Sequence, residues 1–367
     1  MTNTKKERFN WKNYTSYIGL ILLILLSTVL SETFLLPINL MNIAKQVAVP
    51  AILAVGMTFV IISGGIDLSV GSFVALSGVL FAKFGTTIGF IPSAIVMLLF
   101  GLVVGLLYGF FITRMNVPPF IATLAGQTIS KGAALVITSS AAVPILNDGV
   151  NALGSSNLPV IPALILVAAA VAAMVFTEVR SAQQLGIKIN FIKLAAFLLM
   201  AALVIYLVVA TNGLSYIVLI SIILVAFFML VLNSSIFGRN VYAIGGNKDA
   251  SRLAGINVAK NTVCIYAMCS TLACLGGVLT AARLGAGTPQ VGTNWELDAI
   301  AAVIIGGTSF SGGIGKLGGT VVGVLLMGVL NNLLSLKNVP ADAQMIFKGL
   351  IILAAVVIDS KTASDKK

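Results

Sequence analysis

The chain contains 367 residues, of which 59% are hydrophobic and only 9% are charged, and it carries a formal net charge of +11. An ordinary soluble domain has about 25% charged residues, so this composition excludes one. The mean hydropathy of +1.09 and the long continuous apolar runs instead predict an all-α polytopic membrane protein. Runs of this length are about what a hydrocarbon core of roughly 30 Å requires.

The positive charge does not indicate a nucleic-acid partner, because the basic residues are dispersed over short loops and tails, as the positive-inside rule describes. Histidine is absent from the sequence, which removes the commonest metal ligand and proton-transfer group. Cys264, Cys269 and Cys274 are spread around one apolar stretch without a zinc or redox spacing. We therefore expect no metal, no cofactor and no catalytic constellation.

Twelve apolar segments follow one another, and we expect ten to twelve transmembrane helices. The segments lie at about 17–31, 47–66, 68–82, 91–112, 120–137, 161–176, 195–210, 216–232, 262–281, 299–307, 320–336 and 345–359. No small-residue cleavage site follows the first, which favours a retained span over a secretory signal. The second and third are separated only by Asp67, which fits either a tight hairpin or a broken helix. The tenth is too short to span alone, which suggests half of a re-entrant pair.

The distribution of basic residues predicts the orientation. If the N-terminus is cytoplasmic and all twelve segments cross, 16 of the 22 basic residues fall inside. The six outside are Lys45, Lys83, Lys131, Arg283, Lys337 and Lys348. This split predicts cytoplasmic tails at 1–16 and 360–367, a transmembrane domain at 17–359 and a cytoplasmic loop at 233–261.

Glycine is abundant, and two of its patterns are informative. Gly101 and Gly105 form a GxxxG pair, which is typical of close helix packing in a membrane. The dense cluster Gly306–Gly319 breaks helix beside the short tenth segment, which suggests either a re-entrant element or a pathway wall. Lys316 lies in this cluster, but Leu317 follows it and no glycine stands five residues before Gly315, so the phosphate-loop pattern fails. We therefore expect ATP hydrolysis in a partner chain.

The polar stretch Gly238–Lys260 separates two apolar runs. Within it, Ala243–Asn247 predicts a turn that includes Gly245 and Gly246. Asn247 is suited to cap a short helix over Lys248–Leu253, which Gly255 then ends as the first residue beyond the helix.

The composition of this short helix suits a docking element. Asp249 lies near its start and Arg252 near its end, as the helix dipole favours. Ala250, Leu253 and Ala254 give it apolar contact surface. We therefore expect a partner protein to bind here, the alternative being a solvated loop.

Intramembrane acidic residues are few. Asp67 either caps the start of the next helix or faces a pathway or gate. Glu296 and Asp298 open the segment 299–307, where carboxylates favour a helix N-terminus, and they are pathway candidates for the same reason as Asp67.

Three further polar positions are candidates. Gln127 and Lys131 lie one turn apart in the fifth segment, and the lysine either reaches outward or sits in a water-filled vestibule. Asn331 and Asn332 either hydrogen-bond helices together or contact a polar solute.

Taken together, these stretches resemble the permease subunits of bacterial ATP-binding-cassette (ABC) importers for monosaccharides, the ribose, xylose and galactoside group. The matching stretches are ISGGIDLSVGS (62–72), VPPFIATLAG (117–126), FGRNVYAIGGNKDASRLAGI (237–256), ELDAIAAVIIGGTSFSGGIG (296–315) and FKGLIILAAVVIDS (347–360). The usual member has one span between the fifth segment and the cytoplasmic loop, whereas this chain has three. The additional pair at 161–210 resembles xylose-type permeases.

The resemblance implies a cytoplasmic-membrane protein of bacteria with several partners. These are a second permease copy, ABC ATPase subunits and an extracytoplasmic sugar-binding protein. It also implies that the Lys248–Gly255 helix fits a groove on the ATPase. We further expect sugar to pass between two permease copies. The residues that we expect to couple to the ATPase are Gly245, Gly246, Asn247, Asp249, Ala250, Arg252 and Gly255. The sugar would be xylose or a similar pentose or hexose.

Two alternatives remain for comparison. An ion-coupled secondary sugar transporter requires intramembrane acids with proton or sodium roles and inverted repeats, and Asp67 is the only strong candidate. A polytopic membrane enzyme requires a reactive constellation, which the sequence lacks.

Overall fold

The computed structural model describes residues 15–185 and 191–364. About 79% of the chain is helical, which confirms the predicted all-α fold class. In chain order the elements are α1 (Thr15–Leu30), α2 (Pro37–Ile62), α3 (Val70–Ile88), α4 (Phe90–Arg114), α5 (Pro119–Thr138), β1 (Val143–Pro144), α6 (Asp148–Ser155), β2 (Asn157–Leu158), α7 (Val160–Leu185), α8 (Phe191–Ala210), β3 (Leu214–Ser215), α9 (Tyr216–Ser234), α10 (Ile236–Gly246), α11 (Lys248–Leu253), α12 (Val258–Leu284), β4 (Ala286–Gly287), α13 (Trp295–Ile305), α14 (Leu317–Leu336) and α15 (Ala341–Ser364). Most of the predicted tail 1–16, and Lys188, lie outside the described residues.

The helices match the predicted membrane segments. Within the described residues, seven are long and apolar enough to cross a membrane: α2, α3, α4, α5, α9, α12 and α14. Shorter apolar helical stretches lie at Thr15–Leu30, Val160–Ala172 and Leu198–Ala210. Each of the twelve predicted apolar segments coincides with a helix, and the multi-pass membrane character follows from them.

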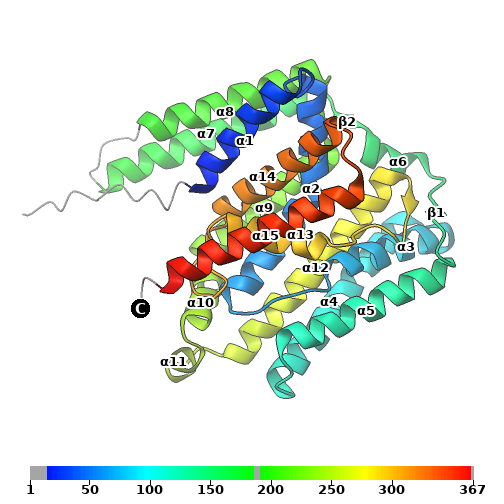
Figure 1. Cartoon of the computed structure of the whole chain (residues 1–367), viewed down its shortest axis with the longest axis vertical. Coiled ribbons are helices and arrows are strands. Elements are labelled where there is room, and N and C mark those ends of the chain that lie inside the picture. Colours follow the sequence, from blue (N-terminus) through cyan, green and yellow to red (C-terminus); the bar gives the residue numbers. More distant parts are fainter. Residues whose placement is uncertain (1–14, 186–190, 365–367) are drawn as a thin grey trace, which may run out of the picture.

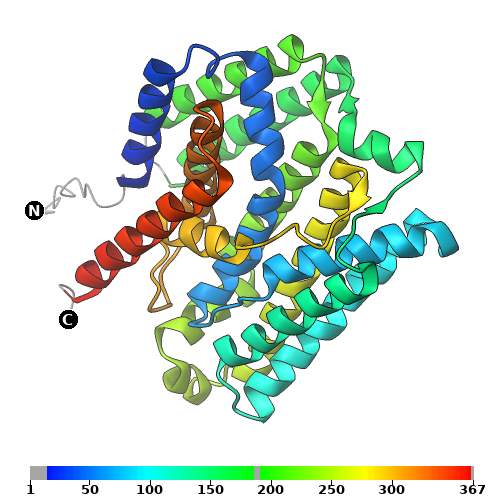
Figure 2. The ribbon, with the colours of Figure 1, turned by 45° about the vertical axis from the view of Figure 1, so that its right-hand side comes forward.

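Helices α2 and α12 form the centre of the bundle. Nearly all of α2 from Ala48 to Ile62 is buried, and α12 packs against α2, α3 and α4. Figure 2 shows α1 and α15 on one flank and α4 and α5 on the other, with α2 between them. The apolar core therefore surrounds this part of α2, which explains why residues 48–62 are hydrophobic on every side.

The contact between α4 and α12 includes close backbone approaches at glycines. A Cβ on Gly101 would overlap Ser270 and Thr271, and one on Gly105 would overlap Tyr266 and Ala267. One turn further on, Gly109 faces Val263 in the same way. Small residues let helix backbones approach closely in a membrane. The predicted packing role of the GxxxG pair is confirmed.

Non-helical links join two pairs of successive helices. Helix α2 ends at Ile62 and α3 begins only at Val70, so a link over residues 63–69 replaces the single-residue separation expected at Asp67. Helix α13 has 11 residues, or about 16 Å, which is too short to span the membrane. The link 306–316 then joins α13 to α14, and its Gly307, Gly312 and Gly313 have positive φ. The predicted helix break in this glycine cluster is confirmed.

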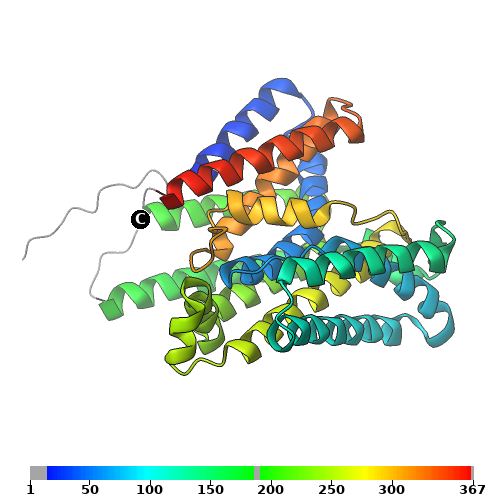
Figure 3. The ribbon, with the colours of Figure 1, turned by 60° about the horizontal axis from the view of Figure 1, so that its bottom comes forward.

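The elements outside the bundle gather at two opposite ends. Figures 1 and 3 place α10, α11, the start of α1 and the end of α15 at one end, and α6 with the strands at the other. The strands form two antiparallel ladders, β1 with β4 and β2 with β3. The second ladder brackets α7 and α8, which coincide with the additional pair predicted at 161–210. The polar loop and both described ends thus share one side, as the charge distribution predicted.

Candidate functional site

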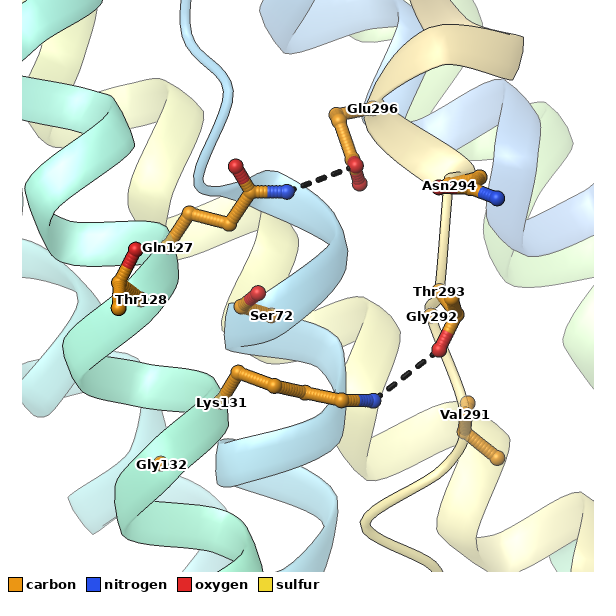
Figure 4. Close-up of a pocket in the computed structure, with 10 residues that line it drawn as sticks. All are labelled: Ser72, Gln127, Thr128, Lys131, Gly132, Val291, Gly292, Thr293, Asn294 and Glu296. Atoms are coloured by element: carbon orange, nitrogen blue, oxygen red, sulfur yellow. Dashed lines mark hydrogen bonds between the residues drawn. The ribbon is translucent and has the colours of Figure 1, made fainter.

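A polar pocket lies between α5, the start of α3 and the segment that leads into α13 (Figure 4). Its volume is about 440 Å³. The residues that line it are Ser72, Gln127, Thr128, Lys131, Gly132, Val291, Gly292, Thr293, Asn294 and Glu296. The fold therefore brings together residues that are far apart along the chain. We call this cavity the polar pocket.

Two side chains of α5 reach across the polar pocket and hydrogen-bond to its opposite wall (Figure 4). The Gln127 amide nitrogen donates a hydrogen bond of 2.8 Å to Glu296 Oε1. The Lys131 ammonium donates to the Pro289 carbonyl oxygen at 2.8 Å and to Thr293 Oγ1 at 3.0 Å. Of the two orientations considered for Lys131, the structure shows the one that points into the pocket. Gln127 and Glu296, both predicted as candidates, are in direct contact.

Close backbone contact between two glycines joins the start of α3 to the segment before α13 at this point. A Cβ on Gly71 would overlap the Gly292 carbonyl oxygen and the Glu296 carboxylate, and one on Gly292 would overlap the Gly71 carbonyl oxygen. Gly292 also has a φ of 76°, a conformation that favours glycine. As a result the N-terminal turn of α3 lies directly against the start of α13.

The polar pocket lies about halfway along the length of α5. Gln127 is eight residues after Pro119 and eleven before Thr138, or about 12 Å and about 16 Å from the two ends of α5 at 1.5 Å per residue. Polar side chains at such depth normally face other protein or a water-filled cavity rather than lipid. Thr128 and Thr293 are nevertheless exposed on the surface of this single chain.

Three predicted candidates lie away from the polar pocket. Asp298 pairs with Lys348 of α15 at 2.7 Å, and both side chains are largely buried. Asn332 and Asn39 exchange two amide hydrogen bonds of 2.9 and 3.0 Å, which join α14 to α2. These contacts fasten helices to one another. Glu296 and Asp298 do lie in the first turn of α13, as predicted.

Asp67 is the third of these residues, and the prediction that it caps the next helix is wrong. Ser69 precedes the first residue of α3, and Asp67 Oδ1 instead accepts from the backbone N–H and the hydroxyl of Ser69. The reason is that α3 starts at Val70, two residues later than the apolar pattern indicates. Asp67 is fully buried, and its Oδ2 accepts no hydrogen bond from the described residues.

The short helix in the polar loop is confirmed as α11. Asn247 Oδ1 accepts from the Ala250 N–H at 2.9 Å, which is the predicted N-cap. At the other end Gly255 has a φ of 83°, and the N–H of Ile256 donates to the Ser251 carbonyl, as in a Schellman motif. The coupling role of this helix remains a prediction.

The surface of α11 is consistent with an exposed element. Asp249 and Arg252 form a surface ion pair at 3.8 Å. Leu253 is 90% exposed, although it is a large apolar residue.

The predicted turn at Ala243–Asn247 is wrong. Helix α10 continues through Gly246, and the chain leaves the helical conformation only at Asn247. The helix starts where Ser235 accepts from the Gly238 N–H. Tertiary contact explains its persistence, because Gly245 packs directly on the backbone of Ile62.

Other residues of the pocket had not been predicted. Ser72, Gly292, Thr293 and Asn294 are hydroxyl, amide and glycine positions that look unremarkable in a single sequence, and Val291 is an ordinary apolar residue. The nearest signal was the polar stretch GTPQVGTN that precedes Trp295. Val291 is its only large aliphatic residue, which sets the stretch apart from the apolar runs around it.

Comparison with known proteins identifies relatives along nearly the whole chain. The family model described as "Branched-chain amino acid transport system / permease component" matches residues 39–356. The xylose transport system permease protein XylH of Haemophilus influenzae is 39% identical over 339 residues, which cover 90% of each chain. The ribose import permease protein RbsC of Bacillus subtilis is 35% identical over 356 residues, which cover 95% of this chain and 92% of that one. No solved structure matches.

Proposed function

Since the chain belongs to the family of the branched-chain amino acid transport system permease component, we propose that it is the membrane permease subunit of an ABC sugar importer. In this family the ATPase is a separate subunit, so the chain itself is not an enzyme. The observation that carries the proposal is the match to sugar permeases over nearly the full length of both chains. The failed phosphate-loop pattern at Lys316 agrees with it.

The proposed substrate is a monosaccharide, with xylose as the first choice and ribose or another pentose or hexose next. XylH and RbsC are named for these two pentoses. The polar pocket offers what a polyhydroxyl solute requires, namely an amide, a carboxylate, an ammonium and hydroxyl groups within one cavity. Such a solute would replace the Gln127–Glu296 hydrogen bond with bonds to its own hydroxyls.

The translocation pathway would pass the polar pocket, between two copies of this chain. The support is that Thr128, Gly132 and Thr293 are exposed on the surface about halfway along the length of α5. They line the pocket together with Lys131 and Glu296. A groove with these groups is costly against lipid, whereas a second copy would cover it and leave it hydrated. We therefore propose a homodimer in which the two copies contact each other along α5 and α13.

The other assignments concern sidedness. We propose that α10, α11 and both termini face the bacterial cytoplasm, with α6 and the strand ladders towards the sugar-binding protein. An ATPase subunit would then bind α11, through Ala250, Leu253 and the Asp249–Arg252 pair. The support is the excess of basic residues on that side and the exposure of Leu253.

The test is sugar uptake by cells that carry or lack this chain, measured with radiolabelled xylose and ribose. The expected result is uptake that requires the chain, stops when cellular ATP is depleted and continues when an uncoupler removes the ion gradient while ATP is maintained. The opposite dependence would indicate the ion-coupled transporter and would overturn the proposal.

A further inference from the structure

Three backbone segments meet at Gly245, near the end of α10. A Cβ on Gly245 would overlap the Ile62 carbonyl oxygen and the Gly313 nitrogen. The Gly313 N–H donates a hydrogen bond of 2.8 Å to that same Ile62 oxygen. We call this contact of Gly245, Ile62 and Gly313 the glycine junction.

Helix α10 touches the link 306–316 at two further points. Gly312 and Gly313 have φ values of 82° and 73°, which turn the link towards α10. A Cβ on Gly313 would lie 2.8 Å from the Gly246 Cα. The Tyr242 hydroxyl donates to the Gly315 carbonyl oxygen at 2.9 Å. The link is thus held against α10 over several residues.

Both links lead to the polar pocket. Ile62 ends α2, and the link 63–69 runs from it to the start of α3, where Ser72 lines the pocket. The link 306–316 follows α13, whose first turn carries Glu296. The start of α3 and the first turn of α13 each form part of the pocket wall. Each is therefore separated from the glycine junction by only one short segment of the chain.

The contact also lacks side chains that would absorb a displacement. Rotamer changes allow a long side chain to adjust when its neighbour moves, whereas close-packed backbones have no such freedom and transmit strain. Contiguous packed contacts and rigid elements of this kind can carry energetic coupling between distant sites.

We propose that Gly245 is a positioning residue for transport: through the glycine junction, movement of α10 and α11 displaces the links 63–69 and 306–316 together and so changes the polar pocket. The inference rests on the proposed function, because it requires an ATPase that moves α11. It goes beyond that function in naming the contact that carries the movement.

The chain provides a matched control for the test. Gly245 and Gly246 are neighbours in the same helix, and neither has a positive φ. A Cβ on Gly246 has no atom within 4 Å, whereas one on Gly245 overlaps two backbone atoms. Gly245→Ala and Gly246→Ala therefore make the same chemical change with and without disturbing the junction.

The experiment uses the whole importer, with this chain, its ATPase and its sugar-binding protein, reconstituted in liposomes. Sugar uptake, ATP hydrolysis and co-purification of the ATPase are measured together. For Gly245→Ala we expect normal co-purification and ATP hydrolysis, but about tenfold less sugar transported per ATP, because overpacking shifts the contact. Gly246→Ala should match the wild type in sugar transported per ATP, because its Cβ leaves the junction undisturbed.

A milder variant protects the test against a folding defect. Tyr242→Phe removes only the hydroxyl that donates to Gly315, and we expect about a twofold fall in sugar transported per ATP, with normal assembly. Equal transport per ATP in the two alanine variants would overturn the inference. If Gly245→Ala fails to assemble, unchanged coupling in Tyr242→Phe would overturn it. Absence of ATP-dependent uptake in the wild type would instead refute the proposed function.

Discussion

The hydrogen bond between Gln127 and Glu296 offers the sharpest test of the polar pocket. Its length is 2.8 Å, and Glu296 is only 4% exposed, so the carboxylate has little water to replace a lost donor. A hydrogen bond to a charged group contributes roughly 1.5–3 kcal/mol, whereas side-chain bonds within membrane bundles average about 0.6 kcal/mol. Because Gln127 is partly exposed, we expect Gln127→Leu to lower the free energy of unfolding by about 1–2 kcal/mol.

A charge at the same position should have a larger effect. Gln127→Glu places a second carboxylate beside Glu296, and two like charges about 4 Å apart repel by about 4 kcal/mol at an effective dielectric constant of about 20. Glu296→Gln in the same chain restores one amide and one carboxylate. The double variant Gln127→Glu/Glu296→Gln should therefore recover most of the lost stability.

The assay combines thermal unfolding of the purified chain in detergent with sugar uptake. Ile129→Leu is the control, because Ile129 lies on the same helix, is 71% exposed and is not a pocket residue. We expect the order wild type, Gln127→Leu, Gln127→Glu in falling stability, with uptake reduced in both variants. If Gln127→Glu is as stable as Gln127→Leu, or if the double variant is no better than Gln127→Glu, the reasoning is wrong.

Three further predictions concern buried contacts. Asn332→Leu should destabilise the chain by about 1–2 kcal/mol, because it leaves the Asn39 amide oxygen without its donor, and adding Asn39→Leu should recover part of this loss in a thermal-shift measurement. The free energy of unfolding of Asp67→Asn should lie within about 1 kcal/mol of that of the wild type. The reason is that an ionised carboxylate with one unpartnered buried oxygen is costly, so a neutral group is favoured there. Asp67→Ala, which loses both bonds to Ser69, should cost about 2 kcal/mol. Gly105→Val should reduce the yield of folded protein on size-exclusion chromatography, because the new side chain overlaps the α12 backbone.

Controls and contrary outcomes are specific to each. For the amide pair, strictly additive effects of the two leucine variants would contradict a direct interaction. For Asp67, a large loss in Asp67→Asn with no greater loss in Asp67→Ala would show that the negative charge is required. For Gly105, the comparison is Gly349→Ala, because a Cβ there has no atom within 4 Å; equal yields would refute the close contact.

Structural features that depend only on adjacent residues were predicted correctly from the sequence. The Asn247 cap and the Gly255 terminus of α11 each need only a few adjacent residues to form. The twelve apolar segments likewise reflect the local requirement of the bilayer. The turn expected at Ala243–Asn247 was wrong for the opposite reason, because Gly245 packs in the helical conformation against Ile62, which is far away in the chain.

The composition of the pocket was only partly predictable. Gln127 and Glu296 stood out because amides and carboxylates are rare at membrane depth, but the pairing between them spans 169 positions and leaves no pattern in either segment. Asn332 and Asp298 stood out for the same reason, and their partners Asn39 and Lys348 show that such residues also fasten helices. Residue type alone does not separate these two uses.

The row of glycines on α4 has a consequence for how the protein moves. Gly101, Gly105 and Gly109 each lie directly against backbone atoms of α12, so the two helices approach closely along this row. Sliding or separation would break contacts along the whole row at once, so the pair behaves as one rigid body. Amide hydrogen exchange should be slowest here, and the structural changes of a transport cycle must take place around this pair.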